Sequence, residues 1–268
     1  MSTREQPFQQ PFQQPQGSAN MLPNGAAGDH PLALLMRRWT MRSSLSASDR
    51  DALASLALTR RSVQRGAYIV HEGEAVTHCS VLISGFVARQ KLVNTGNRQI
   101  VAIHLPGELV DAQNLLLDRA DDSVQSIGQS EVAMIPKSAI LDLIATRPEI
   151  GRAIWLDTII DASITREWVV NLGRRDARAR IAHLLCELYL RLQAIGQCPS
   201  GQCMLPLSQE QIADCMGLTP VHVNRVLQML RADGLIALRA HRLAILDWAQ
   251  LTQVGDFDGR YLHDRIKA

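Results

Sequence analysis

The sequence lacks both the long apolar run of a membrane protein and the strong charge of a protein that coats nucleic acid. No apolar stretch approaches the ~20 residues of a membrane-spanning helix, and the start lacks the apolar core of a signal peptide. The chain carries 28 Lys and Arg against 26 Asp and Glu, a formal net charge of +2. We therefore expect a cytoplasmic protein with no membrane partner, whose affinity for any nucleic acid would depend on local basic residues.

The short motifs of the common enzyme classes are also absent. The sequence contains no P-loop, no Gly-x-Ser-x-Gly, no His-Glu-x-x-His and no His-x-His. A cupin-like metalloenzyme with an appended helical domain is the enzyme alternative, but such a site needs a His-x-His and a carboxylate inside a barrel. We therefore expect a protein that is not an enzyme.

Cysteine is scarce, and its spacing does not indicate a metal site. The five residues are Cys79, Cys186, Cys198, Cys203 and Cys215. A zinc site needs about four ligands, and an iron-sulfur cluster needs about four thiolates, yet no Cys-x-x-Cys occurs and no cysteine precedes Cys79. We interpret Cys198 and Cys203 as two thiols in a loop, as in a reducing compartment, and expect no metal and no resident cofactor.

The most informative stretch, residues 207–230 (LSQEQIADCMGLTPVHVNRVLQML), predicts two short helices joined by a glycine turn. Ser208 and Gln211 have the spacing of a capping box at the start of the first helix. Gly217 stands where a chain leaving a helix needs a positive φ. Thr219 is then the cap of a second helix, with Pro220 in its first turn.

Apolar residues of the second helix recur at i, i+3, i+4 and i+7, so one face is expected to be buried and the other exposed. The buried positions are Val223, Val226, Leu227 and Leu230. Residues 234–246 predict two short strands around a polar tip, a wing. The pattern favours a winged helix-turn-helix whose second helix enters a major groove, and an ordinary αα-hairpin is the alternative. The expected DNA-binding residues are Ser208, Gln209, Thr219, Val221, His222, Asn224, Arg225, Gln228 and Arg174.

The chain as a whole divides by composition into five parts. Residues 1–30 are rich in Gln and Pro and are expected to form a disordered tail. Residues 31–148 contain a short helical pair and then alternating short strands broken by glycines, typical of a β-roll. Residues 149–173 predict a long helix with a hinge at Gly173, residues 174–251 the DNA-binding domain, and residues 252–268 a C-terminal tail.

The long helix has more apolar residues than one buried face requires. We expect the excess to pack against a second copy of the chain, with Ile160 and Ile164 in the interface, although a core helix within one chain is the alternative.

The order of β-roll, long helix and winged helix-turn-helix resembles the Crp/Fnr superfamily of bacterial transcription regulators over roughly residues 45–250. The matching motifs are Gly66 with Ile69, Glu72-Gly73-Glu74, Leu82-Ile83-Ser84-Gly85, Pro106-Gly107-Glu108-Leu109 and Arg180-Ile181-Ala182. The resemblance implies an α+β fold with a cyclic-nucleotide-binding-like sensory β-roll, a homodimer, binding to double-stranded DNA and contact with RNA polymerase. Where the family reads bases with a glutamate and an arginine, this chain has Val221 and Arg225.

The effector is not determined by the sequence. The resemblance to the cyclic-nucleotide cassette makes Glu108, Arg119 and Ser123 the candidate effector-pocket residues. Asp118, Asp121 and Asp122 would surround the phosphate with negative charge, and a phosphate site needs cations or free N–H groups. An effector other than cAMP is therefore favoured, and a cAMP-responsive regulator, with Arg119 as the phosphate ligand, is the alternative.

Two further alternatives are open. Haem could be held by a histidine of the roll, for which the candidates are His71, His78 and His104, but a lone histidine is more often structural. An adaptor whose helices bind only protein is the other alternative, which a gel shift against DNA would exclude.

Overall fold

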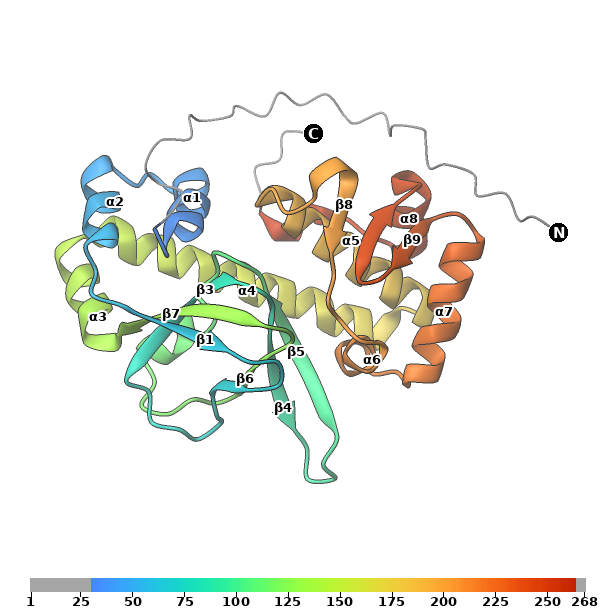
Figure 1. Cartoon of the computed structure of the whole chain (residues 1–268), viewed down its shortest axis with the longest axis horizontal. Helices are drawn as coiled ribbons and strands as arrows, with labels where there is room; N and C mark the ends of the chain where they lie inside the picture. The colour runs from blue at the N-terminus through green and yellow to red at the C-terminus, as the bar shows by residue number, and fades with distance from the viewer. Residues whose placement is uncertain (1–29, 264–268) are drawn as a thin grey trace.

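The fold consists of two lobes that share one long helix (Figure 1). The computed structural model describes residues 30–263, so the predicted tail at residues 1–30 lies, except for His30, outside the described residues. Helix α4 (Pro148–Arg174) passes along both lobes, and it continues through Gly173 rather than bending there. The chain leaves the helix at Arg175, whose backbone is extended. The predicted fold class, a β-roll, a long helix and a winged helix-turn-helix, is confirmed.

The roll is formed by two antiparallel sheets. The first has the order β1-β7-β3, with β1 at Thr59–Val63, β7 at Ser130–Pro136 and β3 at His78–Ser84. The second has the order β2-β6-β4-β5, with β2 at Tyr68–Val70, β6 at Ser123–Ser126, β4 at Val87–Leu92 and β5 at Arg98–His104. The short 3-10 helix η1 (Ala112–Leu115) follows β5. Apolar side chains fill the space between the sheets: Val63, Ile69, Leu82, Val87, Val110, Val124 and Val132.

Three helices pack at the outer end of the roll. They are α1 (Ala33–Arg42), α2 (Ala47–Ala54) and α3 (Lys137–Thr146). Helix α2 begins with a capping box, in which Ser46 and Asp49 each accept a hydrogen bond from the other's backbone N–H. Together with the first turns of α4, these helices bury a second apolar cluster that includes Leu35 and Trp39.

The two sides of α4 have opposite environments. Ile160 and Ile164 are only 3% and 8% exposed and pack into the core of their own chain, so their predicted place in a dimer interface is wrong. The exposed apolar residues of the helix are Trp155, Ile159, Val169 and Val170. Because apolar residues occur on several faces of α4, periodicity alone could not separate the inward face from the outward one.

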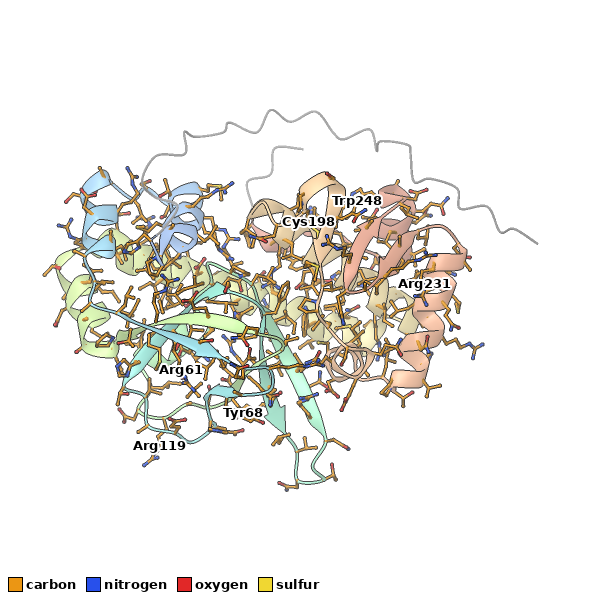
Figure 2. All side chains as sticks on the ribbon, viewed as in Figure 1. Arg61, Tyr68, Arg119, Cys198, Arg231 and Trp248 are labelled. Atoms are coloured by element: carbon orange, nitrogen blue, oxygen red, sulfur yellow. A yellow bond between two sulfur atoms is a disulfide. The ribbon has the colours of Figure 1, made fainter. Side chains whose placement is uncertain are left out.

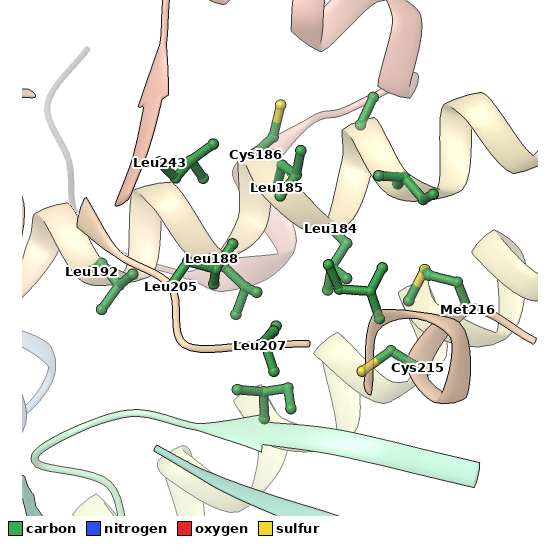
Figure 3. Close-up of a cluster of buried hydrophobic side chains, with 14 of the residues drawn as sticks. Leu184, Leu185, Cys186, Leu188, Leu192, Leu205, Leu207, Cys215, Met216 and Leu243 are labelled. Carbon is green, nitrogen blue, oxygen red and sulfur yellow. The ribbon is translucent and has the colours of Figure 1, made fainter. Parts of the chain in front are cut away.

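The second lobe is built around helix α5 (Ala177–Ala194). After η2 (Pro199–Gly201), strand β8 (Gln202–Met204) precedes the two helices of the helix-turn-helix, α6 (Gln209–Met216) and α7 (Pro220–Ala232). The wing strands β9 (Ile236–Arg239) and β10 (Arg242–Ile245) complete a sheet of order β8-β10-β9. Figure 3 shows Leu184, Leu188 and Leu192 of α5 together with Leu205, Leu207 and Leu243 in the core of this lobe.

The segment predicted as a C-terminal tail, residues 252–268, is folded in its described part. It contains the end of α8 (Trp248–Gly255) and the 3-10 helix η3 (Gly259–Leu262). Leu262 is 2% exposed, and the segment packs on α5 together with the residue just before it, Leu251, which is 0% exposed. Gly255 lies so close to α5 that an added Cβ would be 2.8 Å from the backbone nitrogen of His183.

The prediction of two free thiols at Cys198 and Cys203 is also wrong, because the two residues form a disulfide. The turn of η2 brings their Cα atoms to 4.3 Å, within reach of such a bond. The other three cysteines, Cys79, Cys186 and Cys215, are free and buried.

Candidate nucleic-acid interface

The helix-turn-helix is held together by the caps that its sequence predicts. Ser208 Oγ accepts a hydrogen bond from Gln211 N at 3.1 Å, and Gln211 Oε1 accepts one from Ser208 N at 2.9 Å. Gly217 ends α6 with φ +61°, a conformation that L side chains rarely adopt. Thr219 Oγ1 then accepts from His222 N at 3.3 Å and starts α7. These bonds satisfy backbone groups that helix ends leave without partners, and so define where the two helices begin.

Helix α7 has one buried and one exposed face. The buried residues Val223, Val226, Leu227 and Leu230 are at most 3% exposed. On the other face His222, Arg225 and Gln228 are exposed, Val221 is 81% exposed and Asn224 is half-buried. The predicted reading residues therefore share one accessible side of the helix, the arrangement that a helix needs to present side chains to base edges in a major groove.

The remaining predicted contacts lie beside this face. Gln209 and Thr219 are exposed at the starts of α6 and α7, and Ser208 is half-buried by its cap. Arg174 is exposed at the end of α4. The end of α4 approaches the helix-turn-helix, since a Cβ on Gly217 would lie 3.4 Å from Leu172 of α4.

The wing adds basic residues that the sequence analysis did not assign to the interface. Its tip is a turn in which Ala240 and His241 have φ of 47° and 60°. Arg239, His241 and Arg242 are all exposed there. The signal was the sequence Arg-Ala-His-Arg at the polar tip between the two predicted strands, because cationic side chains at a wing tip can contact phosphates.

The helix-turn-helix is docked on the roll of the same chain. Arg98 on β5 donates from Nε to Asp214 of α6 at 2.7 Å, and Gln99 donates to the Cys215 carbonyl at 3.1 Å. On the other side Arg180 of α5 donates to the Met216 carbonyl at 3.1 Å. These bonds attach α6, the first helix of the helix-turn-helix, and leave the outward face of α7 uncovered.

Glu108, a predicted effector contact, lies instead in a buried ion cluster between the lobes. Its carboxylate pairs with Arg38 of α1 at 2.6 Å and with Arg191 of α5 at 3.1 Å, and contacts His104 Nδ1 at 3.2 Å. Arg191 also pairs with Glu187 at 2.9 Å. Burial raises the pKa of Glu108, but Arg191 and Arg38 outweigh burial and hold that pKa well below its usual 4.5. This carboxylate joins the two lobes, and its oxygens are already occupied.

Arg119 and Ser123 lie together, away from Glu108. Arg119 is exposed and donates to the Gly73 carbonyl at 2.8 Å, and Figure 2 shows it at the outer edge of the roll. Ser123 Oγ accepts from Glu72 N at 2.9 Å. Both side chains therefore hold the turn between β2 and β3, and the three candidate effector residues do not converge on one pocket.

An arginine that the sequence analysis did not select occupies the inner side of this region. Arg89 on β4 is 8% exposed and pairs with Asp161 of α4 at 2.8 Å and with Asp122 at 3.4 Å. Burial raises the pKa of Asp122 to about 6, although Arg89 acts in the opposite direction. The buried guanidinium thus has two carboxylates of its own chain as partners.

Comparison with known protein families matches both lobes. Residues 60–147, from β1 to the end of α3, match the family described as cyclic nucleotide-binding domain, and residues 179–254 match the Crp-like helix-turn-helix domain. The chain is 31% identical over 209 residues to the nitrogen fixation regulation protein FixK of Bradyrhizobium diazoefficiens, covering 78% of this chain and 86% of that protein. The chain belongs to the Crp/Fnr superfamily of bacterial transcription regulators.

Other Crp/Fnr relatives agree with this assignment. The transcriptional activator protein FnrL of Cereibacter sphaeroides is 28% identical over 226 residues, which are 81% of this chain and 90% of that protein. The solved structure of FixK2 from Bradyrhizobium japonicum superposes with a TM-score of 0.68 at 25% identity, covering 74% of this chain and 98% of that one. As a Crp/Fnr regulator, the chain is a sequence-specific DNA-binding protein that acts in transcription. Among residues 30–263, none of the helices combines the length and the apolar character needed to cross a bilayer.

Proposed function

We propose that this Crp/Fnr regulator binds DNA as a homodimer, reading two inverted half-sites with the exposed face of α7. The observation that carries the proposal is the position of Arg225, exposed on α7 and opposite the buried Val226 and Leu227. A guanidinium there can donate two hydrogen bonds to O6 and N7 of a guanine. Val221 cannot accept a hydrogen bond from cytosine and can at most contact a thymine methyl, so the operator should differ from that of members with a glutamate at this position.

The exposed apolar side chains of α4 support the dimer. Trp155 is 66% exposed, Val169 64%, and Ile159 and Val170 are each more than two fifths exposed. A large aromatic and three aliphatic side chains on one helix are costly to leave in water, and a second copy of the same helix would cover them in a two-fold interface. Two α7 helices related in this way would meet successive major grooves ~34 Å apart.

The partners and location follow from this arrangement. Relatives such as FnrL are named transcriptional activators. We therefore propose RNA polymerase as a protein partner and the cytoplasm, where the bacterial chromosome lies, as the place of action. Catalytic activity forms no part of the proposal.

We further propose that the effector is not a cyclic nucleotide. Such a ligand needs an uncompensated cation for its phosphate. Arg119 is directed to the outer β2–β3 turn, and the buried Arg89 is already paired with Asp122 and Asp161. The space between the sheets is occupied by seven apolar side chains. Neither Arg119 nor Arg89 is therefore available to bind a phosphate inside the roll.

The test is selection of binding sites from a random-sequence duplex library with the full-length protein. We expect an inverted repeat with a guanine fixed in each half-site. Arg225→Ala should cost about 1–3 kcal/mol at this site and remove the preference at one base pair per half-site.

The matched control is Arg174→Ala, an exposed arginine at the end of α4. It should weaken binding to all sequences alike and reduce the salt dependence, because a phosphate contact carries no sequence information. If Arg225→Ala recovers the parent motif with unchanged base preferences, the reading face is misassigned. A motif without two-fold symmetry would contradict the dimer.

A further inference from the structure

The cysteine pair of the DNA-binding lobe is asymmetric in a way that suits reversible oxidation. Cys198 is half-buried, in a loop whose neighbours Gln197, Pro199 and Ser200 are exposed. Cys203 is 0% exposed and lies in the main core. Cys198 is therefore partly open to solvent, whereas Cys203 is closed to it.

The remaining cysteines are poor competitors for an oxidant. Cys79, Cys186 and Cys215 are at most 1% exposed. Burial raises the pKa of each thiol above its usual 9.0, which keeps these groups protonated. Because the thiolate is the reactive form, the accessible Cys198 is the cysteine that should react first.

The pair also holds the strand that supports the wing. Cys203 is the middle residue of β8 and lies opposite Leu243 in β10. Just after β8, Leu205 N donates to the His241 carbonyl at the wing tip at 2.7 Å. At its other end the disulfide attaches to the loop after α5, where Cys198 contacts the Tyr189 carbonyl at 3.8 Å. The disulfide therefore joins the end of α5 to the edge strand of the wing sheet. Figure 2 shows the position of Cys198 in this lobe.

Strand β8 is short and lies at the edge of its sheet. It spans three residues and pairs only with β10, from Gln202 to Met204. The loop before it contains Ser200 and Gly201, both with positive φ. The position of such a short edge strand depends strongly on the disulfide. The bond closes the loop from Cys198 to Cys203, and a closed loop has less conformational entropy to lose when the strand pairs.

We propose that Cys198 and Cys203 form a thiol–disulfide switch that makes DNA binding by this regulator responsive to peroxides and to cellular dithiols. In the oxidised form the disulfide holds β8 against β10 and keeps the wing tip, with Arg239, His241 and Arg242, in place beside DNA. In the reduced form β8 is free to separate from β10, and the wing loses its support. This inference rests on the reading surface proposed above.

The chemistry balances with a peroxide as oxidant. The Cys198 thiolate attacks one oxygen of hydrogen peroxide, the O–O bond breaks, and Cys198 becomes a sulfenic acid while one water leaves. The Cys203 thiol then attacks the Cys198 sulfur, forms the S–S bond and releases the second water. Two thiols give up two electrons, which reduce one peroxide to two waters. A dithiol reverses the change by attacking Cys198, displacing Cys203, and closing its own disulfide.

The experiment compares full-length protein treated with hydrogen peroxide and with dithiothreitol, at equal concentration, on the duplex recovered by site selection. We expect the reduced protein to bind about tenfold more weakly, as expected for the loss of one charge-assisted contact to a phosphate. Hydrogen exchange should rise on reduction at the amide of Leu205, which donates to the His241 carbonyl, and the exchange of α7 should stay unchanged.

Three variants make the test specific. Cys203→Ser should accumulate a sulfenic acid on Cys198 that a dimedone probe labels, whereas Cys198→Ser cannot close the disulfide and should bind DNA like the reduced parent protein after either treatment. Cys186→Ala, a core cysteine outside the pair, should keep the full response to both reagents. Circular dichroism of each variant checks that the lobe is folded.

Equal affinity of oxidised and reduced protein, with the change of thiol state verified by mass, would overturn the switch. So would a peroxide-treated protein in which Cys198 and Cys203 stay free. If the protein binds no selected duplex in either state, the proposed reading surface fails instead, and the thiol chemistry is judged from the dimedone and exchange measurements alone.

Discussion

The ion cluster between the lobes yields a sharp prediction for Glu108→Gln. Glu108 is the acid shared by Arg38 and Arg191, whose side chains are 12% and 8% exposed. Arg191 keeps a second acid in Glu187, but among residues 30–263 Glu108 is the one ion-pair partner of Arg38. Removing one member of a buried ion pair costs about 3–5 kcal/mol, because the remaining charge stays desolvated. We therefore expect the free energy of unfolding to fall by an amount in this range.

The assay is urea denaturation followed by circular dichroism at neutral pH, for the variant and for a matched control. Glu131→Gln removes the same charge from a pair with Arg60 whose side chains are 50% and 32% exposed. Exposed pairs contribute up to about 1 kcal/mol, so the control should change little. Because the cluster joins the lobes, the variant should also unfold in two separate steps. Equal, small effects of both substitutions would refute the assignment of Glu108 as the central ion of the junction.

The same cluster sets a pH dependence. The pKa of Glu108 is lowered well below 4.5 in the folded protein, so the folded state binds this proton more weakly than the unfolded state. Its contribution to stability is therefore complete above about pH 4.5 and is lost as the pH falls through the lower, folded pKa. The difference in stability between the parent protein and Glu108→Gln should accordingly shrink under acidic conditions and stay constant between neutral pH and pH 6.

Two further predictions test the proposed function. Trp155→Asp should weaken the dimer at least about 100-fold in sedimentation equilibrium, because covering a side chain that is 66% exposed contributes on the order of 3 kcal/mol per copy. The control Ile160→Asp lies on the buried side of α4 and should instead lower the melting temperature. Variants of Trp155 that remain dimeric would place the interface elsewhere. Calorimetric titration with cAMP or cGMP should show no micromolar binding, since Arg119 faces outward and Arg89 is paired; binding that also tightens the operator complex would restore the cyclic-nucleotide alternative.

Local patterns in the sequence predicted the helix-turn-helix well. Each helix start in the helix-turn-helix depends on a side chain three residues from its backbone partner, as for Ser208 with Gln211, and each turn depends on a glycine or a proline. Such signals involve neighbours in the chain, so one sequence suffices. Strand β1 has no local signal of this kind. Four of its five residues, Thr59 to Ser62, are exposed, so no alternation of apolar and polar residues marks it.

The candidate effector site and the disulfide depend on contacts that a sequence pattern does not reveal. Glu108 looked like a ligand contact because its neighbours Gly107 and Leu109 resemble a family motif, yet its main partner Arg191 lies 83 residues away. Cys198 and Cys203 are close in sequence, but the same spacing fits a loop with two free thiols. The positive φ of Ser200 and Gly201 turns the chain back on itself and brings the sulfurs together, and this turn has no distinctive residue signature.

Helix α5 contacts both the ion cluster around Glu108 and the disulfide of Cys198 and Cys203, but through different residues. Arg191, which is paired with Glu187, holds the roll through Glu108, whereas the loop after the helix carries the disulfide to β8. Reduction of the disulfide changes the support of the wing and leaves every ion pair of the junction intact. Loss of Glu108 weakens the docking of the lobes and leaves β8 paired with β10. Since the two sites share no hydrogen-bond or ion-pair partner among residues 30–263, their effects on DNA affinity should add, and the redox response should persist when the junction is weakened. A sensory signal from the roll and an oxidant can thus act on the same DNA-binding lobe through different contacts.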